Sequence, residues 1–138
     1  LLPPGCARPA PARRLDLREP ADSWPLDAAD DVRALVATNV IHIAPWPAAV
    51  GLFAGAARWL RPDDPLILYG PFARDGRHTG AGNVRFDADL RAQNPAWGIR
   101  DLERDVVPEA SRAGLSLDAV HPMPADNLTV VLRRANRT

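Results

Sequence analysis

The sequence predicts an α/β fold in which a parallel βαβ unit is followed by helices and a C-terminal antiparallel hairpin. An apolar, β-branched run at 34–39, a helical pattern at 47–60 and a second apolar run at 66–69 follow one another along the chain. This order is typical of a crossover between two parallel strands. The segments 115–120 and 128–132 are too closely spaced for another crossover, so they should pair antiparallel in the same sheet.

The helix at 47–60 has the clearest local signals. Pro47 suits the first turn of a helix, and Val50, Phe53 and Leu60 follow at helical spacing. The segment 61–65, RPDDP, then ends the helix, because proline is not tolerated in a helix interior.

The remaining elements are predicted from caps, stops and composition. Asn83 should cap a helix that runs to about residue 92, and Asp105 should cap a helix that ends at Gly114. The other expected segments are a proline-rich extended lead-in at 1–13, a very short strand at 15–17, a long loop at 71–82, one domain portion at 14–134 and a tail at 135–138.

Composition excludes several classes of protein. A chain of 138 residues has room for one domain, and 17 basic residues balance 17 acidic ones, so nucleic acid and membrane are not expected partners. Cys6 is the only cysteine, which excludes an internal disulfide and favours the cytoplasm. Three separated histidines do not form a metal-binding pattern, so no metal is expected. The chain begins with Leu, which suggests a fragment.

His42 is the first candidate for chemistry, because it follows the predicted strand at 34–39 and its imidazole can act as a general base near neutral pH. The alternative is a loop histidine that is hydrogen-bonded to the backbone. No established catalytic signature, such as a phosphate-binding loop or a serine nucleophile elbow, occurs in the sequence.

A second group of candidates surrounds the end of the strand at 66–69. Aromatic and basic residues near that strand end would converge on the ligand edge of a parallel sheet, although a solvated mobile loop is the alternative. The candidate substrate-binding residues are Trp46, Tyr69, Phe72, Arg77, His78 and Asn83.

Several phrases together resemble the family catalogued as domain of unknown function 938, which includes the methyltransferase-like protein 26 family. The resemblance covers about residues 14–134 and implies a class I S-adenosylmethionine-dependent methyltransferase-like protein. The phrases are NVIHIAPW (39–46), LFAGA (52–56), LYGPF (68–72), DGRHT (75–79), Asn83, FD (86–87), WGIRDL (97–102) and PADNL (124–128).

The resemblance implies a partial Rossmann-like methyltransferase fold with strand order 3-2-1-4-5-7-6, of which this chain supplies the C-terminal portion. The segments at 15–17, 34–39 and 66–69 would be strands 3, 4 and 5. It further implies S-adenosylmethionine as cofactor and Asp16 as the partner of the adenine amine. Asn39 and His42 would lie beside the reacting methyl group as the catalytic residues, with Asn39 also binding the cofactor.

Strands 1 and 2 of that family, with the glycine-rich cofactor loop, have no counterpart in the sequence. We therefore expect the chain alone to bind S-adenosylmethionine poorly. The alternatives to a methyltransferase fragment acting on an unknown small molecule or protein are a non-catalytic binding module derived from the same fold and a truncated, non-functional product.

Overall fold

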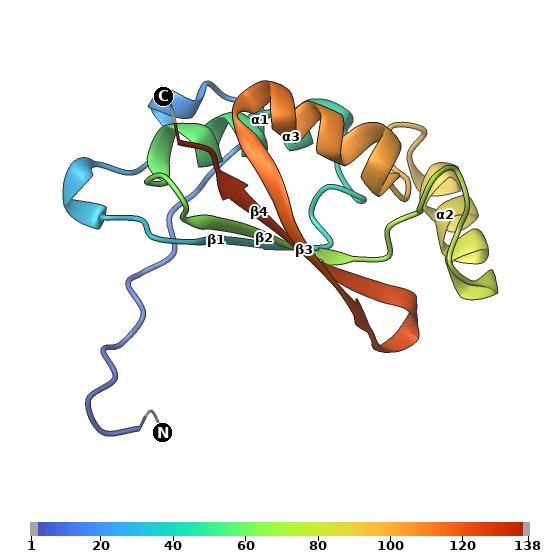
Figure 1. The fold of residues 1–138 in the computed structure, drawn as a ribbon, viewed down its shortest axis with the longest axis horizontal. Helices are drawn as coiled ribbons and strands as arrows, with labels where there is room; N and C mark the ends of the chain where they lie inside the picture. The colour runs from blue at the N-terminus through green and yellow to red at the C-terminus, as the bar shows by residue number, and fades with distance from the viewer. Residues whose placement is uncertain (1–2, 137–138) are drawn as a thin grey trace.

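A computed structural model describes residues 3–136, in which four strands form one sheet with helices (Figure 1). The strand order is β1-β2-β4-β3. The bounds are β1, Leu35–Thr38; β2, Pro65–Gly70; β3, Leu115–Met123; and β4, Asn127–Arg134. This order matches the 4-5-7-6 half of the expected sheet, so the predicted fold class is confirmed.

The βαβ unit is confirmed by the pairing of its strands. Strands β1 and β2 are parallel, in register from Leu35 with Leu66 to Thr38 with Tyr69, and α1 (Trp46–Trp59) connects them. β4 pairs antiparallel with both β2 and β3, which confirms the hairpin. β3 extends three residues beyond the predicted 115–120 and includes Pro122, which an edge strand tolerates because one side of its backbone needs no sheet partner.

One face of the sheet carries the core. Helices α1 and α3 (Val107–Ala113) contact each other and lie on the same side of the sheet (Figure 1). The strand residues buried against them alternate, as expected for strands that are covered on one face. They are Ala37, Leu66, Leu68, Leu115, Leu128, Val130 and Leu132.

The predicted short strand at 15–17 is wrong. These residues are not paired with any strand of the described chain; instead the segment lies on α1. A Cβ atom on Gly51 of α1 would lie only 1.6 Å from the Leu17 carbonyl oxygen, and one on Gly55 would lie 2.0 Å from the Trp24 ring. Two glycines one helical turn apart therefore let residues 17–24 approach the helix closely. Two short 3-10 turns, Ala21–Ser23 and Ala28–Asp30, lead from this segment towards β1.

Helix α2 (Ala81–Gln93) follows a loop at 71–80 that is anchored by a bridge between Ala73 and Asp101. Its N-cap is Gly80 rather than the predicted Asn83, whose buried side chain donates to Thr79 Oγ1 and to the Asp126 carbonyl.

The cap predicted at Asp105 is instead Asp101, whose carboxylate accepts from the Arg104 amide. A π-helical turn at Leu102–Val106 joins it to α3, and this earlier start places the cap four residues upstream. Helix α3 ends as predicted at Gly114, with φ 94°.

None of the helices within residues 3–136 has the length and hydropathy that crossing a membrane requires.

Candidate functional site

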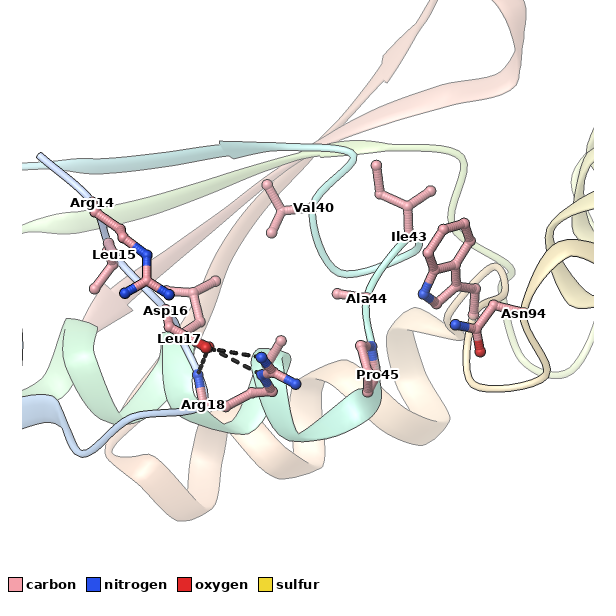
Figure 2. A pocket seen from close by; sticks show the side chains of 12 residues that line it. Arg14, Leu15, Asp16, Leu17, Arg18, Val40, Ile43, Ala44, Pro45 and Asn94 are labelled. Carbon is pink, nitrogen blue, oxygen red and sulfur yellow. Dashed lines mark hydrogen bonds and ion pairs between the residues drawn. The ribbon is translucent and has the colours of Figure 1, made fainter. Parts of the chain in front are cut away.

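A cleft of about 540 Å³ lies between the N-terminal segment and the loop that follows β1 (Figure 2). Residues 14–18 form one side, Val40 and residues 43–45 form the other, and Asn94 lies at one end. Trp97 also lines the cleft. The cleft therefore brings the predicted Asp16 next to the loop that carries Asn39 and His42, although those two residues do not line it. The lining residues are Arg14, Leu15, Asp16, Leu17, Arg18, Val40, Ile43, Ala44, Pro45, Ala48, Asn94 and Trp97.

Asp16 remains ionised in this cleft. Its Oδ1 accepts from the amide and Nε of Arg18 at 3.0 Å each, and its Oδ2 accepts from Nη2 at 2.8 Å (Figure 2). These hydrogen bonds and the Arg18 charge lower the pKa of Asp16 to about 2. The cleft thus contains a fixed carboxylate, a group that accepts hydrogen bonds from an amine.

Asn39 and His42 lie directly after β1, at the carboxyl edge of the parallel strands. Asn39 has φ 58°, a left-handed conformation that Asn adopts more readily than most residues, and its amide donates to the Tyr69 carbonyl at 2.8 Å. The turn at Asn39 ends the strand and directs the following loop back over the sheet edge.

His42 is fully buried, with its ring edge-to-face against Phe72 at a centroid distance of 4.8 Å. The Arg100 amide donates to Nδ1 at 3.1 Å, whereas Nε2 is buried and has no hydrogen-bond partner. Burial, together with the nearby Arg100 charge, lowers the pKa of His42 to about 4. The ring is neutral at pH 7, and its one free lone pair is already used by a backbone donor. This geometry corresponds to the backbone-bonded alternative more closely than to a general base.

Arg100 organises the loop after β1, a role that the sequence did not reveal. Its guanidinium donates to the carbonyls of Ile41 and Ala44 at 3.0 and 2.8 Å, and it lies 5.4 Å from the centroid of the Trp46 ring. Burial lowers the pKa of Arg100. The arginine belongs to the quoted phrase WGIRDL, which was the only signal of its importance.

The other predicted substrate-binding residues are dispersed. Tyr69 is half-buried on β2, and Phe72 is fully buried behind His42, so its side chain faces no cleft in this structure. Arg77 is exposed, and Asn83 holds the loop to the β3–β4 connection.

His78 belongs to a second, smaller cleft of about 270 Å³, which shares no lining residue with the first. Its Nε2 lies 3.6 Å from the carboxylate of Asp87, which also accepts from the Ile99 amide at 2.8 Å and from Arg91. This network attaches α2 to the segment that precedes Arg100, so His78 does not meet Asn39 or His42.

A model of the family described as Protein of unknown function (DUF938) matches residues 8–134. The chain belongs to this family. The match extends over the cleft, the sheet and α1 to α3, so the DUF938 region includes every candidate residue named above.

Solved structures with the same fold include methyltransferases. Human N-acetylserotonin methyltransferase in complex with SAM superposes with a TM-score of 0.71 at 12% identity, over 90% of this chain and 33% of that chain. An O-methyltransferase family protein from Burkholderia thailandensis has a TM-score of 0.62 at 16% identity, over 80% of this chain and 34% of that chain. The complex of LepI with SAM has a TM-score of 0.66 at 13% identity, over 87% of this chain and 29% of that chain.

The DUF938 chain thus has a methyltransferase-like fold and spans about a third of the length of these solved proteins.

Proposed function

We propose that this DUF938 chain forms the acceptor-side part of an S-adenosylmethionine-dependent methyltransferase whose substrate is an unknown small molecule or protein. The observation that carries the proposal is the cleft, in which the Asp16 carboxylate lies opposite the loop after β1. Support comes from the fold shared with SAM-bound structures and from the position of this cleft at the carboxyl edge of the parallel strands, where ligands of open α/β sheets bind.

The residues of the cleft fit the adenosine part of that cofactor. An ionised Asp16 accepts a hydrogen bond from an aromatic amine, and Val40, Ile43 and Pro45 offer apolar surface to a flat ring. The arginines at 14 and 18 line the same side and keep the carboxylate charged.

Catalysis by this site depends on positioning. When bound, the cofactor supplies an electrophilic methyl group. Val40, Ile43 and Pro45 would pack against the bound ligand, and the turn at Asn39 would hold the methyl acceptor near the end of β1. Positioning of two reactants can lower a barrier by about 7–11 kcal/mol without a general base.

A titration of the ¹⁵N-labelled chain with S-adenosylhomocysteine tests the proposal. Because the cleft would cover the ligand on one side only, we expect weak, millimolar binding. The amide chemical shifts should change only at residues 14–18, 40–45 and 94–97. Asp16→Asn should raise the apparent Kd from this titration by about tenfold, since a hydrogen bond to a charged group contributes about 1.5–3 kcal/mol.

The matched control is Asp22→Asn, which removes an exposed carboxylate that is bonded to Arg58 and does not line the cleft. This variant should bind like the wild type. Absence of shifts in the cleft at millimolar ligand would contradict the proposal and favour a non-catalytic binding module.

A further inference from the structure

His42 has a defined protonation pattern because of one backbone contact. A neutral imidazole carries a single N–H, and the Arg100 amide, which is always a donor, points at Nδ1 from 3.1 Å. Nδ1 must therefore be the acceptor, and the ring hydrogen must lie on Nε2. Nε2–H is then a buried donor without a partner, within a residue that has no exposed surface.

The surroundings of Nε2 indicate its partner. A Cβ atom placed on Gly70, at the end of β2, would lie 2.7 Å from His42 Nε2 and 3.0 Å from Asn39 Oδ1. Both polar atoms therefore lie within 3.0 Å of one point above Gly70, and any side chain larger than that of glycine would displace them. A buried donor without an acceptor is unfavourable, so a rotation of the Asn39 side chain that brings Oδ1 to Nε2–H would stabilise the site.

We propose that His42 is a positioning residue, which donates from Nε2 to Asn39 Oδ1 and so turns the Asn39 amide nitrogen towards the ligand edge. The second half of this inference rests on the proposed function. An amide nitrogen held in this way donates to a lone pair, so the ligand group beside Asn39 would be a carbonyl oxygen or an unprotonated ring nitrogen.

The burial of the ring supports the same assignment. The pKa of His42 is lowered to about 4 mainly by desolvation and then by the Arg100 charge, against which a backbone hydrogen bond at Gly98 and the Asp87 charge raise it. Phe72 adds an uncharged face. A ring that stays neutral and is donor-only at Nε2 orients an amide and does not remove a proton from the methyl acceptor.

The test that needs no ligand is a long-range ¹H–¹⁵N spectrum of the full labelled chain. We expect a bare Nδ1 and a protonated Nε2 for His42, unchanged between about pH 5.5 and 8, where an ordinary histidine changes charge. A protonated Nδ1, or titration near the ordinary pKa of about 6.5, would overturn the inference on the wild-type protein alone.

Variants test the contact with Asn39. His42→Gln keeps a donor near the position of Nε2 and should preserve the side-chain amide resonances of Asn39, whereas His42→Ala should shift them. His121→Gln, at an exposed position on β3, is the matched control and should leave them unchanged. Equal perturbation by the Gln and Ala variants at position 42 would refute a donor role.

The ligand arm uses S-adenosylhomocysteine. His42→Ala should weaken its binding by about tenfold and His42→Gln by less than about threefold, as expected for one hydrogen bond. If the ligand changes the chemical shifts of residues 14–18 but not those of Asn39, the inference that Asn39 faces the ligand is wrong and the proposed function stands. If no residue shifts, the proposed function fails, whereas the ring spectrum still decides the state of His42.

Discussion

Gly51→Ala is the most direct perturbation of the contact that places Asp16 in the cleft. The added methyl group would lie 1.6 Å from the Leu17 carbonyl oxygen and 2.7 Å from the Leu17 carbonyl carbon. Ordinary contact begins at 3.4 Å, so the carbonyl oxygen must retreat by about 1.8 Å. Because both atoms are backbone atoms, no side-chain rotation relieves the clash, and the neighbouring Asp16 must move with Leu17.

The expected cost follows from two opposing effects. Overpacking of this kind costs about 1–3 kcal/mol, whereas replacing glycine by alanine inside a helix gains about 0.5–1 kcal/mol. We therefore expect a net loss of about 1–2 kcal/mol in the free energy of unfolding, together with weaker ligand shifts at residues 14–18.

Urea denaturation followed by tryptophan fluorescence measures this loss, and Trp24, which packs on Gly55, reports on the same segment. Gly82→Ala is the matched control, because nothing lies within 4 Å of its added methyl group on the exposed side of α2. It should gain stability by about 0.5–1 kcal/mol. A similar gain in Gly51→Ala would show that residues 15–18 do not lie on α1 and would remove the basis for the cleft.

Two further predictions concern pH and the attachment of α2. Since the pKa of His42 is about 4 in the folded chain and about 6.5 when unfolded, the unfolded state binds more protons between these values. The free energy of unfolding should therefore fall by about 3 kcal/mol as the pH falls from 7 to 4, and His42→Gln should lack that part of the fall in urea denaturation at each pH. Asp87→Asn should weaken the contacts to Arg91 and His78 and speed hydrogen exchange of the α2 amides. Protection equal to wild type would mean that Leu90 and the Asn83 hydrogen bonds hold the helix without Asp87.

The neighbourhood of Asp16 shows where a resemblance was informative and where it was not. The family resemblance pointed to Asp16 and to the loop after Asn39, which the cleft brings near each other. The resemblance also assigned the short strand that the local sequence predicted at 15–17 as strand 3, and the structure has a segment packed on α1 there instead. Within the described residues no strand pairs with this segment, so its backbone is placed by the fit against a helix and not by a ladder of hydrogen bonds.

The sequence by itself determined the βαβ unit, the helix at α1 and the hairpin of β3 and β4. Each depends on a local period of hydrophobic residues and on proline or glycine at its ends, and such signals are complete within one segment. The tertiary structure alone decided the state of His42, because the amide of Arg100, 58 residues away along the chain, occupies Nδ1. The tertiary structure also decided that Gly70 leaves room for His42 and Asn39 to lie close to it. A contact between segments that are distant in the sequence produces no hydrophobic periodicity from which it could be predicted.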